Sequence, residues 1–70
     1  MPGPYELDVV LPMLARVNRQ VGAVCAVHLA AYVTASERTL RAQLGRLERA
    51  GLVSRPYGPR NGWVAQKVLH

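Results

Sequence analysis

Apolar residues recur at helical spacing in the first part of the chain. One helical face would carry five of them: Leu7, Val10, Leu11, Leu14 and Val17. Asp8 is a suitable amino-terminal cap, which would place Pro12 among the first four helical residues, where no intrahelical amide partner is lost. The pattern therefore predicts a helix that starts at Asp8 and tolerates Pro12, preceded by a loose leader over residues 1–5.

A second apolar segment, VCAVHLAAYV, covers residues 24–33. The segment before it, NRQVG at residues 18–22, has the composition of a break between helices, with Gly22 closing the turn. The alanines of the second segment allow close packing, so we expect a second helix there, followed by a tight connector at residues 34–35. A short strand near Val21 would be an additional partner for a hairpin further along the chain.

The third pattern lies in the stretch SERTLRAQLGRLERAGLV at residues 36–53. Ser36 fits an amino-terminal cap, and Gly51 fits the residue that ends a helix in a left-handed conformation. Three leucines at i, i+4, i+7 spacing should face the core: Leu40, Leu44 and Leu47. At about 100° per residue, the opposite half carries Arg38, Arg41, Ala42, Gly45 and Arg49, with Arg46 at its margin. The stretch predicts a helix over 36–50 with one apolar and one basic side.

The last segment has the pattern of a β-hairpin, in which extended LVSR and WVAQKVL flank the turn-rich PYGPRNG. Asn61-Gly62 is a strong signal for a two-residue type I′ turn, whereas Pro56 and Pro59 predict an edge ribbon with a wide or irregular tip. Trp63 is expected to pack on the domain. The predicted fold class is therefore α+β, mostly α, in a single domain over residues 1–70.

Charge is distributed unevenly along the chain. The sequence has 70 residues and a net charge of +5, and half of its residues are hydrophobic. Residues 1–35 hold two arginines and two acids, whereas residues 36–70 hold seven basic residues and two acids. This asymmetry favours a nucleic acid or another anionic surface as partner, and the hydrophobic content argues against a disordered chain.

Few residues are available for redox, metal or membrane chemistry. Cys25 is the lone cysteine, has apolar neighbours and is expected to be a buried thiol. With two widely separated histidines, metal-ligand spacing is absent, so we expect no metal and no cofactor. The apolar runs are too short to span a membrane and no signal segment is recognisable, so we expect a cytoplasmic protein that binds no membrane.

From residue 23 onward, the chain resembles the winged helix-turn-helix domains of bacterial transcriptional regulators. LAAYVTAS, residues 29–36, looks like the family's second helix, tight turn and serine cap, and SERTLRAQLGRLERAGLVSR looks like its recognition helix and exit into the wing. Thr34 stands where the turn often has glycine. With the first helix included, the resemblance covers nearly all of the chain and implies three helices followed by a C-terminal β-hairpin wing.

The resemblance implies sequence-specific binding of double-stranded DNA, as a transcriptional regulator. The recognition helix, 36–50, would enter the major groove, and the wing, 55–63, would lie on the backbone or in the minor groove. Arg38 and Arg41, near the helix start, are the candidates for reading bases. The predicted DNA-contacting residues are Ser36, Arg38, Thr39, Arg41, Ala42, Gly45, Arg46, Arg49, Arg55, Tyr57, Arg60 and Lys67.

Other functions remain open. A winged helix can serve as a protein interaction or assembly module, or as an architectural or recombination accessory factor on DNA. The arginine face can also be a solvated surface with weak i, i+4 pairs to Glu37 and Glu48. An enzyme is not expected, because the acids are not placed as a pair and a domain of this size has little room for a substrate cleft. Cys25 and His28, three residues apart on a predicted helix, are the one candidate nucleophile and base.

A single module of this size makes few base contacts, so a homodimer is expected if the DNA site is specific. The first helix offers Val9, Met13 and Val17 as an interface, and the C-terminal VLH is the alternative.

Overall fold

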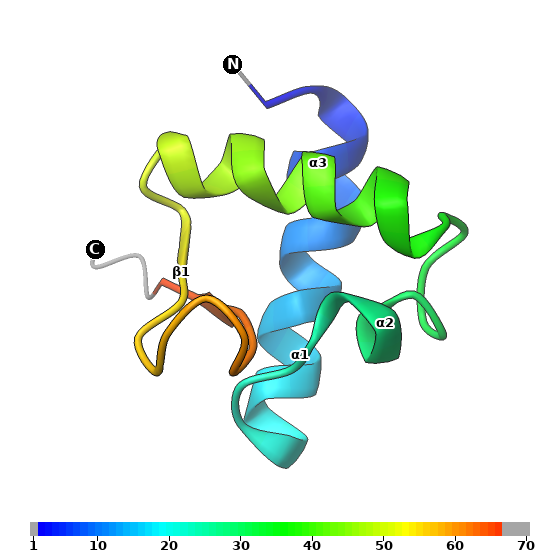
Figure 1. Ribbon diagram of the computed structural model, residues 1–70. Helices are drawn as coiled ribbons and strands as arrows, with labels where there is room; N and C mark the ends of the chain where they lie inside the picture. Colours follow the sequence, from blue (N-terminus) through cyan, green and yellow to red (C-terminus); the bar gives the residue numbers. More distant parts are fainter. Residues whose placement is uncertain (1, 67–70) are drawn as a thin grey trace.

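The computed structural model describes residues 2–66 as a mostly helical α+β fold (Figure 1). In chain order, its elements are a π-helical turn η1 (Glu6–Val10), the helices α1 (Leu11–Val21), α2 (Ala26–Leu29) and α3 (Glu37–Arg49), and the strands β1 (Val53–Ser54) and β2 (Val64–Ala65). The two strands pair antiparallel. The predicted class, three helices with a C-terminal hairpin, is confirmed.

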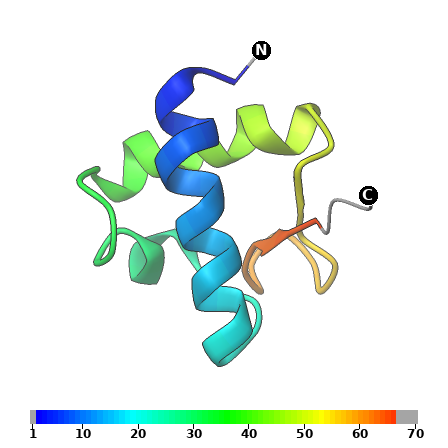
Figure 2. The same ribbon diagram turned by 180° about the vertical axis from the view of Figure 1, so that it is seen from behind.

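The helices cross rather than run side by side. In Figure 1, α3 passes in front of η1 and α1, while Figure 2 shows the same crossing from behind, with α1 in front. α2 and the hairpin lie on the two sides of the lower half of α1. The core fills the space between these elements, and its largest fully buried side chains are Val10, Leu14, Leu29, Leu40, Leu44, Leu47 and Val53.

The first helix begins earlier than predicted. Pro4 and Tyr5, assigned to the loose leader, are already helical, and the amide of Leu7 donates to the carbonyl of Gly3 at 3.1 Å. The acid that accepts from an amide at the helix start is Glu6, which binds the amide of Gly3 at 3.2 Å. Asp8 is therefore not the cap, because proline fits the first helical position and starts the helix four residues earlier.

Pro12 is accommodated by a wider turn and not by a position in the first turn. The amide of Leu11 donates to the carbonyl of Glu6, five residues back, directly before the proline. This spacing defines a π-helical turn, which relieves the clash of a proline ring with the preceding turn. Because each residue of the wider turn rotates through a smaller angle, Leu7 leaves the core-facing side and is 41% exposed, contrary to the predicted apolar face.

The second helix is shorter than predicted. Only Ala26–Leu29 is helical, and the chain continues through turns to Ser36. Val24, which we assigned to this helix, is extended and forms a β-bridge with Trp63, with backbone hydrogen bonds of 2.8 and 3.2 Å. The additional strand expected near Val21 therefore exists only as this bridge at Val24, since Val21 ends α1. Pairing with the hairpin competes with the helix for the same backbone groups.

The third helix agrees with its prediction. The hydroxyl of Ser36 accepts a hydrogen bond from the amide of Thr39 at 3.1 Å, which satisfies one of the free donors of the first turn. Three leucines of this helix are completely buried: Leu40, Leu44 and Leu47. Gly51 has a φ of +79°, the conformation expected for a glycine that follows a helix.

The hairpin has the expected strands but not the expected turn. Val53 pairs with Ala65 and Ser54 with Val64, so that residues 55–63 form a long irregular loop. A type I′ turn would need a positive φ at Asn61, and among residues 2–66 only glycines have a positive φ. The irregular tip predicted from the two prolines is confirmed, and the predicted type I′ turn is wrong.

Within residues 2–66, no helix combines the length and hydropathy that a membrane crossing requires.

Candidate functional site

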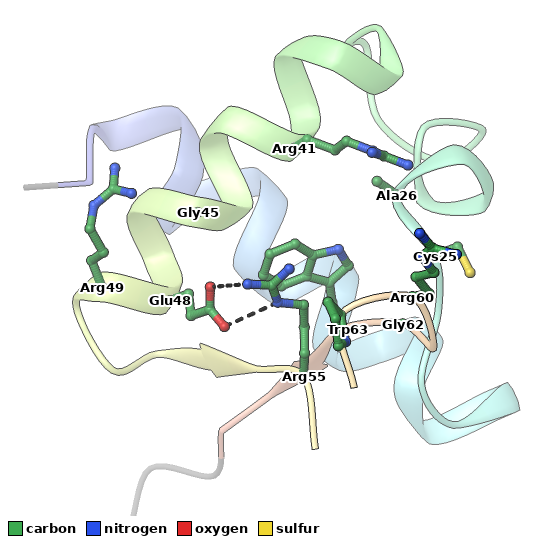
Figure 3. A pocket seen from close by; sticks show the side chains of 11 residues that line it. Cys25, Ala26, Arg41, Gly45, Glu48, Arg49, Arg55, Arg60, Gly62 and Trp63 are labelled. Carbon is green, nitrogen blue, oxygen red and sulfur yellow. Dashed lines mark hydrogen bonds and ion pairs between the residues drawn. The ribbon is translucent and has the colours of Figure 1, made fainter. Parts of the chain in front are cut away.

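A basic hollow of about 520 Å³ lies between α3 and the hairpin loop (Figure 3). Its lining comes from α3, from the loop and from the start of α2: Cys25, Ala26, Arg41, Gly45, Glu48, Arg49, Arg55, Pro59, Arg60, Gly62 and Trp63. Four of these residues are arginines and one is an acid. Sequence segments that are far apart are thus brought together around a concave surface of positive charge.

The α3 wall of the hollow is built by helical spacing. Arg41, Gly45 and Arg49 follow one another at intervals of four residues, and Arg38 and Ala42 continue the exposed face beyond the hollow. A Cβ built on Gly45 would meet only the guanidinium of Arg49, at 3.7 Å, so the helix backbone is accessible there. The predicted basic and small residues of α3 therefore share an exposed face, opposite the buried leucines.

The start of α3 carries two polar residues of the predicted site. Ser36 and Thr39 are both exposed, and the Ser36 hydroxyl donates to the Thr39 hydroxyl at 3.0 Å while it caps the helix. In the same turn, Arg41 forms an ion pair of 2.8 Å with Glu37, and its side chain is 68% exposed. This pair is the predicted i, i+4 contact, and its exposure makes it weak.

Arg46 does not line the hollow, although we predicted it as a DNA contact. Its Nε donates to the Oε2 of Glu6 at 2.6 Å, which ties α3 to η1. The hydrogen bond from Arg46, together with that from the amide of Gly3, lowers the pKa of the Glu6 carboxyl below its ordinary value, although burial opposes this shift. Arg46 therefore joins two elements of the fold.

Arg55 is also bound within the protein. Its Nε and Nη2 donate to the two carboxylate oxygens of Glu48, at 3.1 and 2.9 Å, and its guanidinium lies 4.5 Å from the ring centroid of Trp63. Figure 3 shows the guanidinium between the acid and the indole. Trp63 is 8% exposed, so its predicted packing on the domain is confirmed. The predicted pair between Glu48 and a residue of α3 is replaced by this contact.

The tip of the loop carries the remaining predicted contacts. Arg60 is exposed and lines the hollow, and Tyr57 is 67% exposed, with its carbonyl accepting a hydrogen bond from the side chain of Asn61. Lys67, and the C-terminal VLH suggested for dimerisation, lie outside the described residues.

Some of the arginines near the hollow form ion pairs and others do not. Within residues 2–66, three ion pairs occupy Glu6, Glu37 and Glu48. In the same part of the chain, Arg38, Arg49 and Arg60 form no ion pair, and all three are exposed. Arg16 and Arg19 of α1 are likewise exposed and form no ion pair in this part of the chain. Of these unpaired arginines, Arg49 and Arg60 line the hollow.

Two expectations for Cys25 are corrected. The thiol is half-buried, not buried, and it lines the hollow. Cys25 precedes α2 in an extended conformation, so it does not share a helical face with His28 as a catalytic pair would require. Within residues 2–66, no group of three His, Cys, Asp or Glu side chains is placed to hold a metal ion.

The suggested dimer face on the first helix is only partly available. Val9 is 38% exposed and Met13 is half-buried, but Val17 is 3% exposed and belongs to the core. Val17 cannot contribute to an interface without unfolding of its surroundings.

The sequence did not reveal the two acids that organise the arginines. Arg46 binds Glu6 and Glu48 binds Arg55, and in each pair one partner lies outside α3, so the periodicity of α3 does not predict the contact. Asn18 was also missed. Its side chain donates to the carbonyl of Trp63 at 3.1 Å and accepts from the amide of Ala65 at 2.8 Å, which fixes β2 to α1. The one available signal was its polar side chain near the end of an amphipathic helix.

Comparison with known proteins gives no family model that matches the chain, and no significant match to a curated protein or to a solved structure.

Proposed function

We propose that this protein binds double-stranded DNA as a winged helix-turn-helix regulator, with α3 in the major groove and the hairpin loop on the backbone or in the minor groove. The observation that carries the proposal is the surface shared by α3 and the loop. It presents Arg38, Arg49 and Arg60 without an ion pair among residues 2–66, beside a helix backbone left open at Gly45.

The dimensions and chemistry of α3 support this partner. A helix about 10–12 Å across fits the major groove of B-form DNA. Three completely buried leucines hold α3 from behind, and the small exposed side chain of Ala42 allows close approach. Arginine near the start of such a helix can bind guanine through two hydrogen bonds, so Arg38 and Arg41 are the base-reading candidates.

The roles of the other basic residues follow from their surroundings. Arg49 and Arg60 are exposed on the two walls of the hollow and are assigned to phosphates. Ser36 and Thr39 are exposed at the start of α3, where backbone amides and hydroxyls suit a phosphate oxygen. Arg46 and Arg55 are not assigned to direct contact because each is held by an acid in a partly buried ion pair, whereas the pair of Arg41 with Glu37 is exposed and weak.

The test is fluorescence anisotropy of the full chain with a random pool of labelled DNA duplexes at several salt concentrations. The variant Arg49→Ala/Arg60→Ala removes two charges from the proposed face. Its matched control, Arg16→Ala/Arg19→Ala, removes two exposed arginines of α1. Each phosphate contact contributes about 0.9 to the slope of log affinity against log salt, so the first variant should lower the slope by about two.

The control variant should keep the slope of the wild-type chain. Equal losses in the two variants would move the binding surface away from α3 and the loop. No binding of the wild-type chain even at low salt would reject DNA as the partner and favour an acidic protein surface. Sequencing of the retained duplexes then establishes whether a motif is enriched, as a regulator requires.

A further inference from the structure

The hairpin loop is attached to the body of the protein at both of its ends. On the β1 side, the guanidinium of Arg55 makes two hydrogen bonds to Glu48 of α3 and stacks on Trp63 (Figure 3). On the β2 side, Trp63 exchanges two backbone hydrogen bonds with Val24, and its carbonyl also accepts from Asn18. The loop thus contacts α1, the start of α2 and α3.

The approach of the loop to the start of α2 is close. A Cβ built on Gly62 would lie 2.9 Å from the backbone nitrogen of Val24 and 3.1 Å from the Ala23 side chain. Only a residue without a side chain fits at this point. The position of the loop relative to the start of α2 is therefore set by direct packing, and the contact of Arg55 with Glu48 joins the loop to α3.

The same contacts determine what the hollow offers to a nucleic acid. Trp63 is the one aromatic residue in its lining, the guanidinium of Arg55 lies over its ring, and the residue as a whole is 8% exposed. Proteins that bind single strands without sequence preference rely on exposed aromatic rings on which bases stack. With its ring covered, the hollow offers charge but no stacking platform.

We propose that Arg55 is a positioning residue that, together with Glu48 and Trp63, holds the hairpin loop at a fixed separation from α3 and makes the hollow selective for double-stranded over single-stranded DNA. The inference rests on the proposed function and deepens it, since it names the residues that make the site favour a duplex over a single strand. A preformed surface with two walls matches a rigid duplex, because no ordering of the loop is needed when the duplex binds.

Glu48 gives the sharpest test, because a positioning role and a purely electrostatic role predict opposite changes in duplex affinity. On charge alone, Glu48→Gln removes a negative group from a basic surface and should tighten duplex binding. If Glu48 holds Arg55, the same change should weaken it, by about fivefold or more. Glu37→Gln is the matched control on the same helix: its exposed carboxylate binds Arg41 and not the loop, so this variant should bind duplex as tightly as the wild-type chain or tighter.

Arg55 and Arg60 form a second matched pair, since both line the hollow and each carries one positive charge. Arg60→Ala should weaken binding to duplex DNA and to single-stranded DNA of the same sequence to a similar extent. Arg55→Ala should weaken the duplex but uncover Trp63, so that the ratio of duplex to single-strand affinity falls by about fivefold or more. Arg55→Lys keeps the charge but loses the two guanidinium donors that bind Glu48, so it should weaken duplex binding as Arg55→Ala does.

Trp63 is the sole tryptophan, so its fluorescence reports whether the Arg55 guanidinium covers its ring, without any DNA. Quenching by acrylamide should be weak in the wild-type chain and clearly stronger in Arg55→Ala. Circular dichroism confirms that each variant is folded at the temperature used, and Arg55→Lys replaces Arg55→Ala if the latter unfolds. Equal quenching in the two chains would overturn the covering role of Arg55 whether or not DNA binds.

The DNA measurements separate the two proposals. A wild-type chain that binds duplex, with Glu48→Gln binding as tightly or tighter, overturns the positioning role and leaves the proposed function intact. A wild-type chain that prefers single strands overturns the selectivity. Absence of any DNA binding overturns the proposed function and the selectivity with it, while the quenching result still decides the contact of Arg55 with Trp63.

Discussion

The Nε of Arg46 lies 2.6 Å from the Oε2 of Glu6, a contact that joins residues 40 positions apart. It connects the last turn of α3 to the π-helical turn η1. The carboxylate also accepts from the amide of Gly3, so a single side chain holds the amino-terminal segment and α3 together. The arginine face of α3 is thus divided between residues that stabilise the fold and residues free to meet a partner.

Stability should depend on the ionisation of Glu6. Its pKa is lowered in the folded state by Arg46 and Gly3, so folding is favoured when the carboxyl is ionised. The contribution is complete above the unfolded pKa, about 4.3, and is lost as the pH falls through the lower folded value. Urea unfolding at a series of pH values should show this loss in the wild-type chain and a smaller one in Glu6→Gln. Asp8→Asn, an exposed acid of the same turn, should behave as the wild-type chain.

The core of α3 should tolerate truncation poorly. Leu44→Ala removes a completely buried side chain and should lower the free energy of unfolding by about 2–5 kcal/mol. Such a loss is a large share of the stability of a small domain. Leu7→Ala, at a position 41% exposed, should cost far less. Urea denaturation followed by circular dichroism measures both, and similar losses would contradict the assignment of Leu7 to the surface.

The amino-terminal cap of α3 should contribute measurably to the stability of the fold. Ser36→Ala leaves the amide of Thr39 without its acceptor and should cost about 0.5–2 kcal/mol. Ser36→Asp keeps an acceptor and adds a favourable charge at the helix start, so it should retain most of the stability. Thermal melts of the two variants give the comparison. An equal loss in both would mean that the Ser36 hydroxyl is not the group that matters.

Gly62 should be more sensitive to a side chain than Gly51. Both have positive φ, at +101° and +79°, so alanine is strained at either position. At Gly51 the added Cβ meets no atom within 4 Å, whereas at Gly62 it meets the backbone of Val24 at 2.9 Å. Gly51→Ala should cost about 1–2 kcal/mol from backbone strain, and Gly62→Ala more. Chemical denaturation that ranks them in the opposite order would contradict the close packing of the loop.

On the proposed function, residues of α3 and of the loop should differ in what their removal changes. Arg38→Ala or Arg41→Ala should cost about 1–3 kcal/mol on the preferred sequence and relax specificity, because a base contact is lost. Arg60→Ala should weaken preferred and random duplexes alike. Anisotropy titrations on an enriched and a scrambled duplex separate these effects. A uniform loss in all three variants would reject the assigned roles.

Local patterns in the sequence were sufficient for α3. The serine cap, the leucine spacing and Gly51 act within one helix, so the interactions that shape it are near neighbours in the chain. The start of α2 was placed too early because Val24 pairs with Trp63, a residue of the hairpin, and does not join the helix. The start of the first helical segment was misplaced because Pro4 and Tyr5 were assigned to a loose leader, whereas proline fits the first position of a helix.

In the candidate site, too, local spacing was predictable from the sequence and contacts between elements were not. The exposed positions of Arg38, Arg41 and Arg49 follow from helical periodicity, and periodicity gave them correctly. The ion pairs of Arg46 with Glu6 and of Arg55 with Glu48 depend on tertiary structure. From the sequence, both arginines were therefore predicted as DNA contacts like the others. Counting four acids against nine basic residues predicts that most arginines stay unpaired, but not which ones.

Asn18 has a further effect on the hairpin. Its side-chain amide accepts from the amide of Ala65 and donates to the carbonyl of Trp63, while Val24 pairs with Trp63 beside it. These groups occupy the outer edge of β2, the row of donors and acceptors on which a strand of another molecule would otherwise add. A chain with a two-residue β2 and a covered edge gives little opportunity for growth of a sheet between copies. The side chain of Asn18 and the backbone of Val24 therefore close the outer edge of β2 to strand addition by another molecule.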